Sequence, residues 1–210
     1  MLDVKRDMIS NIAQKSGTKE VEEPEKALVQ RASKGDRDAY RILVEKYQNR
    51  VYSLIVSMVK SKEDAEDITQ EAFVKAYLSL KNFRGDSSFY TWIYRVAYNM
   101  TIDFKRRSSK RSEFLATGPR SEDGSEAPPL DGVATDGNPL EEVERRELAG
   151  SLEKAMAQLT EEHRAVIMLR EVDGLSYSEI ADVVGVSQGT VMSRIHYAKK
   201  YLQQALKEFA

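Results

Sequence analysis

The spacing of apolar residues constrains the fold of this chain more than any other feature of its sequence. Along residues 40–59 apolar side chains recur at intervals of three and four, the period of an amphipathic helix. They are Tyr40, Leu43, Val44, Tyr47, Val51, Leu54, Ile55, Met58 and Val59. Nowhere do residues alternate convincingly between apolar and polar, as a strand with one solvated face requires. The sequence therefore predicts an all-α fold.

Two further helices are expected before residue 109. Ser61 begins a capping-box-like sequence ahead of an apolar stripe that runs through residues 68–80. Either of two serines, Ser87 or Ser88, can cap a third helix. Its predicted buried stripe consists of Phe89, Trp92 or Ile93, Val96, Ala97, Met100 and Phe104. The spacing leaves open which of the two residues at positions 92 and 93 faces the core.

A stretch rich in proline and glycine divides the 210-residue chain. Residues 109–140 hold four of its five prolines and four of its eleven glycines, with almost no periodic apolar residues. Such a segment cannot bury enough surface to offset the entropy lost on ordering, so we expect a flexible, disordered linker there. Residues 1–23 are expected to be a flexible tail for the same reason. The predicted architecture is two small helical domains, residues 24–108 and residues 141–210, joined by this linker.

Composition excludes several kinds of site. The chain has no cysteine and only two histidines, which excludes disulfides and Cys-based zinc sites and argues against a histidine-rich metal centre. No apolar run is long enough to cross a bilayer and no secretion signal is visible, so we expect a soluble, intracellular protein. There is no phosphate-binding glycine loop, nucleophile elbow or histidine beside a candidate nucleophile. The sequence therefore predicts no catalytic residue, metal ligand or cofactor.

The strongest local signal lies at about residues 176–196. Ser176 can cap a short helix, Gly185 permits a tight turn because it lacks a Cβ, and Ser187 can cap a second helix. This pattern predicts a helix-turn-helix, whose second helix has the right width for the DNA major groove. The face opposite its buried stripe carries Gly189, Met192, Ser193, His196 and Lys200. An ordinary helical hairpin is the alternative, and the basic residues around the second helix favour DNA.

The third helix of the first domain has a second, more polar face. It consists of Tyr94, Tyr98, Thr101 and Lys105, with Thr91 and Arg95 beside it. Aromatic residues interleaved with cations suit single-stranded nucleic acid, because bases stack on rings and cations follow the backbone. Packing of the tyrosines against a neighbouring helix is an equally good interpretation from periodicity alone. Both interpretations stay open at this point.

The helix before it carries an acidic surface. Its members are Asp64, Glu66, Asp67 and Glu71. Such a run is usually a solvated face or a complement to the helix dipole, so by itself it predicts no partner.

Three segments of the chain resemble segments of bacterial RNA polymerase sigma factors, in the same order. Residues 64–77 are similar to their core-polymerase-binding segment, residues 83–99 to their promoter-melting segment, and residues 159–194 to their helix-turn-helix domain. The resemblance covers roughly residues 25–108 and 141–207. It is to the compact extracytoplasmic-function (ECF) group, which keeps only the second and fourth sigma domains.

The resemblance implies three sets of binding residues. Contact with core RNA polymerase, at about residues 67–80, is implied for Asp64, Asp67, Ile68, Gln70, Glu71, Phe73, Val74 and Tyr77. Recognition and melting of the minus-10 element, at about residues 83–107, is implied for Arg84, Gly85, Asp86, Ser87, Tyr90, Thr91, Trp92, Tyr94, Arg95 and Asn99. Reading of the minus-35 duplex is implied for Ser187, Gln188, Gly189, Thr190, Met192, Ser193, Arg194, His196, Tyr197, Lys199 and Lys200. Met192 and Tyr197 depart from the common pattern, in which relatives often carry Lys or Arg.

The function implied by the resemblance is a dissociable initiation factor with no reaction of its own. Its implied partners are core RNA polymerase, promoter DNA in duplex and single-stranded form, and an anti-sigma factor. Its implied location is the bacterial cytoplasm, without membrane insertion. The alternatives are a conventional helix-turn-helix regulator with a helical sensor domain, and an enzyme. The helix-turn-helix fits either class of transcription protein, whereas the polymerase-binding segment fits the sigma factor alone.

Overall fold

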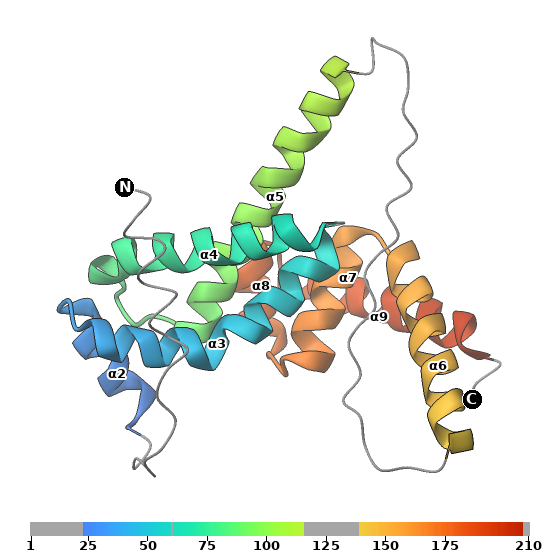
Figure 1. The fold of residues 1–210 in the computed structure, drawn as a ribbon, viewed down its shortest axis with the longest axis horizontal. Helices are drawn as coiled ribbons and strands as arrows, with labels where there is room; N and C mark the ends of the chain where they lie inside the picture. Colours follow the sequence, from blue (N-terminus) through green and yellow to red (C-terminus); the bar gives the residue numbers. More distant parts are fainter. Residues whose placement is uncertain (1–22, 60, 116–138, 208–210) are drawn as a thin grey trace.

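The computed structural model describes residues 23–59, 61–115 and 139–207, in which every regular element is helical (Figure 1). A first group of helices consists of α2 (Glu25–Ser33), α3 (Arg37–Met58), α4 (Lys62–Ser79), the 3-10 turn η2 (Leu80–Asn82) and α5 (Phe89–Leu115). A second group consists of α6 (Pro139–Gln158), α7 (Glu161–Ile167), the π-helical turn η3 (Met168–Val172), α8 (Tyr177–Val184) and α9 (Gln188–Ala205). The predicted all-α fold is confirmed.

Serine caps fix where two helices of the first group begin. Ser61 accepts a hydrogen bond from the backbone N–H of Asp64 at the start of α4. Ser88, rather than Ser87, accepts from the backbone N–H of Thr91 at the start of α5. Each bond satisfies an N–H group that the helix itself leaves without a partner, which is why these positions favour serine.

Helices α3, α4 and α5 pack around a shared apolar core. Its fully buried members include Leu43, Val51, Leu54, Ile55, Ala72, Ile93 and Ala97. Ile93 therefore takes the core position, and Trp92 is only half-buried. The indole lies at the edge of the group, with its ring centroid 5.2 Å from that of Phe83 and 5.8 Å from that of Phe89.

Helices α8 and α9 form the predicted helix-turn-helix. Ser176 and Glu179 make a complete capping box, in which each side chain accepts a hydrogen bond from the other's backbone N–H. Gly185 ends α8 with a φ of 71°, a left-handed conformation that glycine adopts without a Cβ penalty. Ser187 then caps α9 by accepting from the backbone N–H of Thr190. The buried face of α9 consists of Val191, Ile195 and Ala198.

The two groups of helices pack directly against each other (Figure 1). Helix α5 lies against α8, and α3 lies against α7. One hydrophobic core runs through both groups, so that the contact between them is continuous with the interior of each. Apolar periodicity predicted two domains on a tether and contained no sign of this docking.

Both ends of the predicted linker are helical. Helix α5 continues through Leu115, and its last part projects away from the other helices (Figure 1). Lysine and arginine, which are frequent there, are good helix formers, so the absence of an apolar stripe did not end the helix. Helix α6 begins at Pro139, because proline is favoured in the first helical position. Residues 116–138 of the predicted linker, and residues 1–22 of the predicted tail, lie outside the described residues.

Candidate nucleic-acid interface

The loop between η2 and α5 surrounds a small hollow of about 190 Å³. Its lining consists of Asn82, Phe83, Arg84, Gly85, Asp86, Ser87, Trp92 and Arg95. Gly85 has a φ of 77°, so the loop depends there on a residue without a Cβ. Arg84 and Arg95 are exposed and place two positive charges beside a half-buried indole. Six residues predicted to contact the minus-10 element thus surround one open site.

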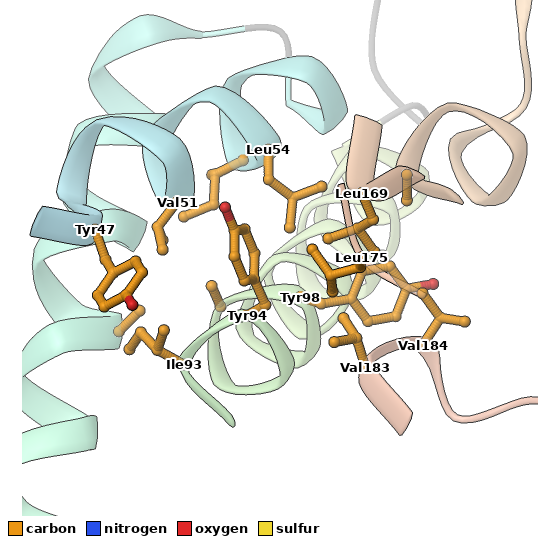
Figure 2. Close-up of a cluster of buried hydrophobic side chains, with 14 of the residues drawn as sticks. Tyr47, Val51, Leu54, Ile93, Tyr94, Tyr98, Leu169, Leu175, Val183 and Val184 are labelled. Atoms are coloured by element: carbon orange, nitrogen blue, oxygen red, sulfur yellow. The ribbon is translucent and has the colours of Figure 1, made fainter. Parts of the chain in front are cut away.

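The tyrosines of α5 do not line that hollow, and two of the three are buried. We call Tyr90, Tyr94 and Tyr98 the tyrosine face. Tyr94 is 1% exposed and Tyr98 is 6% exposed. Figure 2 shows the Tyr98 ring among side chains of the second group, which are Leu175, Val183 and Val184. Thr91 is buried as well, whereas Asn99 on the same helix is exposed.

Two tyrosine hydroxyls donate hydrogen bonds across the contact between the groups. Tyr94 donates to Asp173 Oδ1 at 2.5 Å, and Tyr90 donates to Glu179 Oε1 at 2.5 Å. Glu179 thereby serves both the capping box of α8 and the docking of α8 on α5. The structure supports the packing interpretation of Tyr94 and Tyr98, since both side chains are buried and the Tyr94 hydroxyl contacts the second group through Asp173.

Burial shifts the pKa values of the groups at this contact. It raises the pKa of Tyr94, and the hydrogen bond to Asp173 raises it further. Burial likewise raises the pKa of Asp173, although the Tyr94 hydrogen bond and the charge of Arg50 oppose the rise. The second carboxylate oxygen, Asp173 Oδ2, is buried without a hydrogen-bond partner among the described residues. A buried oxygen of this kind costs free energy in the docked arrangement.

The outer face of α9 is open to solvent. Most of the residues predicted to read the minus-35 element are exposed, namely Ser187, Gln188, Gly189, Met192, Ser193, His196, Tyr197, Lys199 and Lys200. Thr190 and Arg194 are half-buried. Lys199 already pairs with Glu171, with its Nζ 2.9 Å from the carboxylate. Among the exposed residues, the large side chains of Met192 and Tyr197 are 54% and 63% exposed.

The predicted polymerase-binding residues of α4 fall on both sides of the helix. Asp67, Gln70, Glu71 and Val74 are exposed, and we call these four residues the α4 face. Asp64 and Tyr77 are half-buried. Ile68 and Phe73 are buried in the first group, where they pack α4 against the core.

Several polar pairs at the contact between the groups had no signal in the sequence, although Lys105 itself was placed on the polar face of its helix. Lys105 donates to the Glu161 carboxylate, which makes an ion pair between α5 and α7. Arg164 donates from Nη1 to the backbone carbonyl of Ser57 at 2.6 Å, and its other nitrogens bind carbonyls at the end of α6. Burial lowers the pKa of Arg164. Pairs so distant in sequence follow no local period, so pattern analysis could not find them.

Two further searches concern the described part of the chain alone. No cluster of three or more His, Cys, Asp or Glu side chains there could hold a metal ion. No helix there is both long and apolar enough to cross a membrane.

Comparison with known proteins assigns the family. The family models Sigma-70 region 2 and Sigma-70, region 4 match residues 43–111 and 149–207. The RNA polymerase sigma-H factor of Pseudomonas aeruginosa is 38% identical over 194 residues, covering 89% of this chain and 95% of that protein. The ECF RNA polymerase sigma-E factor of Escherichia coli K12 is 38% identical over 187 residues, covering 87% and 94%.

A solved structure agrees in fold. The sigma factor RpoE of Bartonella quintana, in complex with the anti-sigma factor NepR, is similar with a TM-score of 0.64 at 21% identity, covering 80% of this chain and 96% of that chain. Its helices and those of the present chain thus share one overall arrangement. From these relatives and family models, the chain belongs to the ECF group of RNA polymerase sigma factors and supports promoter-directed initiation of transcription.

Proposed function

We propose that this sigma factor directs RNA polymerase through two modules that read different forms of DNA. The observation that carries the proposal is the outer face of α9, which is solvent-exposed on a fully capped helix-turn-helix. The open hollow beside α5 gives the second module. The chain supplies binding free energy while polymerase performs the chemistry, so the proposal assigns no catalytic residue or cofactor to it.

Helix α9 reads the minus-35 element as duplex. Gln188 and Ser193 are exposed near the start of the helix and suit the donors and acceptors of base edges in the major groove. Met192 lies beside them and offers the kind of apolar surface that contacts a thymine methyl group. Arg194 and Lys200 contribute contacts to phosphates, which fix the register of the helix on the DNA.

The hollow beside α5 captures the opened minus-10 strand. Trp92 supplies a ring for stacking of an unpaired base, and Arg84 and Arg95 attract its backbone phosphates. Taking a base out of the stack costs a few kcal/mol, and stacking in the hollow offsets part of that cost. Asn99, exposed one turn further along α5, extends the same surface.

The α4 face is the proposed docking site for core polymerase. Its exposed side chains, which are acidic or polar except for Val74, form one surface that the first group's core does not use. An anti-sigma factor is a further proposed partner, in keeping with the complex of the Bartonella quintana relative with NepR. We propose the bacterial cytoplasm as its location.

A transcription assay with purified components tests this function. Core polymerase and the full chain are mixed with a promoter template recovered from the chain's own genome, and the RNA start is mapped. Promoter-specific RNA is expected only when both proteins are present. The matched control template carries scrambled minus-35 and minus-10 elements. The control protein is the Glu45→Arg variant, an exposed change on α3, which should direct the same RNA as the wild-type chain. RNA that starts at the same site with core alone would contradict the proposal.

DNA binding by the chain alone separates this function from the conventional regulator. Residues 141–210 hold nine basic and twelve acidic residues, so the second group has few positive charges that could contact DNA phosphates. Gel shifts at moderate salt are therefore expected to show little specific complex until core polymerase is added. Tight, specific binding by the chain alone would favour the regulator.

A further inference from the structure

The last part of α5 is strongly basic. Residues 103–111 hold five basic residues and one acidic residue, Asp103. Figure 1 shows the last part of the helix projecting away from the other helices. Arg106 and Arg107 are exposed there, whereas the neighbouring Lys105 is paired with Glu161 of α7. We call Arg106 and Arg107 the basic end, which presents its charges to solvent.

Such a charge run is costly for a helix that projects from the body of the protein. In the sequence, Arg106 and Lys110 are like charges four residues apart. Arg107 and Arg111 repeat the spacing one residue later. Like charges at this spacing destabilise a helix, and a helix without tertiary packing is marginal in water. A polyanion bound along the helix would replace this repulsion by attraction, so the charge run favours a ligand of high negative charge.

The basic end continues the face of α5 that borders the hollow. Arg95 lines the hollow, and Asn99 is exposed one turn further along. Arg106 follows Asn99 by seven residues, which is about two turns of an α-helix, so it lies on the same face. Along the helix axis Arg106 lies about 16 Å from Arg95, the length of about five base-pair steps in duplex DNA. One face of α5 thus leads from the hollow to the basic end.

Duplex DNA suits the basic end better than a single strand does. A protein that binds a single strand offers open aromatic rings on which bases stack. Among residues 103–109 the one aromatic residue is Phe104, and its side chain packs against the hydrophobic core. The two guanidinium groups can each bind a phosphate through two donors, and a duplex carries twice the phosphate density of one strand. Cations without rings therefore match phosphates rather than unpaired bases.

We propose that the basic end binds phosphates of the duplex between the minus-35 and minus-10 elements, next to the opened strand. This inference rests on the proposed function, in which the hollow takes the opened strand and α9 takes the minus-35 element. Contacts with phosphates carry no sequence information. The basic end therefore positions α5 at the boundary between duplex and opened DNA without selecting a sequence.

The test uses the full chain with core polymerase and two templates from one promoter. The first template is duplex from the minus-35 element to the start of the minus-10 element and open from there on. The second template begins at the minus-10 element and lacks the duplex between the elements. Binding to each is measured over a series of salt concentrations, because each phosphate contact contributes about one to the slope of log affinity against log salt.

The informative variant combines Arg106→Gln with Arg107→Gln, because glutamine keeps the helix propensity of arginine and removes its charge. Its matched control combines Lys26→Gln with Lys154→Gln, which removes two exposed charges from α2 and α6. We expect the arginine variant to lower the slope by about two on the first template and to match wild type on the second. The lysine variant should match wild type on both.

Asp103→Asn separates a binding role from a structural one. The Asp103 carboxylate pairs with Arg106, with 3.0 Å between Oδ1 and Nη2, and both side chains are solvent-exposed. Removing its charge frees Arg106 and ends a repulsion with phosphates. Affinity for the first template is therefore expected to rise about threefold, whereas a residue that only supports the helix would give no gain. Circular dichroism must show unchanged helix content in every variant.

Two results would overturn the proposal. One is an unchanged slope for the arginine variant on the first template, or an equal fall on both templates, since the arginines would then not bind the duplex between the elements. The other is unchanged or weaker binding of the first template by Asp103→Asn. The proposed function fails separately, because it is judged by promoter-specific RNA from the wild-type chain with core polymerase.

Discussion

The docking of the two groups can be followed by titrating the phenols of Tyr94 and Tyr98. Burial raises the pKa of both phenols, and for Tyr94 the hydrogen bond to Asp173 adds to the rise while Arg50 opposes it. The docked form therefore favours neutral phenols. The contribution of these two phenols to the stability of the docked form is fully present below the ordinary tyrosine pKa of about 10 and is lost as the pH rises above that value. We expect Asp173→Ala to let these phenols titrate nearer 10, measured by phenolate absorbance.

Tyr40 is the internal control for that titration. Burial raises its pKa too, but its hydroxyl donates to the backbone carbonyl of Phe73 inside the first group. Its titration should therefore stay late in wild type and in Asp173→Ala alike. A wild-type chain in which every phenol titrates near 10 would show that neither Tyr94 nor Tyr98 is held by the docking.

The burial and pairing of individual side chains could not be predicted from the sequence. Positions 92 and 93 lie about 100° apart on a helix, so periodicity could not choose between Trp92 and Ile93. The structure buries Ile93 because the larger Trp92 finds room at the edge, against Phe83 and Phe89. Asp173 was beyond reach altogether. Its partner lies 79 residues away, and a lone aspartate after a helix is ordinary.

At the scale of an element, α4 presents its polar face for binding rather than for stability. Asp67 and Gln70 are exposed, and a surface change of this kind alters the free energy of unfolding by less than about 0.5 kcal/mol. We predict that Asp67→Arg and Gln70→Ala each lower affinity for core polymerase, about tenfold for the charge reversal. A core-binding titration and thermal unfolding measure the two quantities together.

The control for α4 is a charge reversal on another helix. Glu45→Arg changes an exposed acidic residue of α3 in the same way and should leave core affinity unaltered. If neither α4 variant binds core more weakly than Glu45→Arg, polymerase docks elsewhere on the chain.

Elements were the scale at which the sequence was most informative. The caps at Ser61, Ser176 and Ser187 and the turn at Gly185 were all predicted, because each has a local chemical cause that acts within a few residues. The end of α5 was not, since its last part is polar and carries no apolar stripe to mark a helix. Local rules thus predicted where most helices start, and less well where one of them stops.

The whole molecule depends on contacts that no local rule describes. The two groups meet through α5 with α8 and α3 with α7, and a shared core passes between them (Figure 2). From periodicity, the tyrosine face was equally compatible with DNA and with a neighbouring helix. The docked form satisfies the second interpretation.

The two proposed DNA modules can be separated by the form of DNA that each requires. Arg95 and Asn99 are exposed on α5 near the hollow, whereas Arg194 and Lys200 belong to α9. Changing Arg95 and Asn99 to Ala should spare closed-complex formation and impair opening, seen as lost permanganate reactivity at the minus-10 region. Changing Arg194 and Lys200 to Ala should weaken the closed complex and reduce its salt dependence, because phosphate contacts are lost.

A premelted bubble template decides whether this division of labour is real. It removes the melting step but leaves the minus-35 duplex to be bound. We therefore expect it to restore transcription by the α5 double variant to within about threefold of wild type, while the α9 double variant stays reduced about tenfold. Glu45→Arg, tested on both templates, should match wild type. Equal rescue of the two double variants would mean that α5 and α9 do not act on separate steps, because a melted template can replace only the work of opening the duplex.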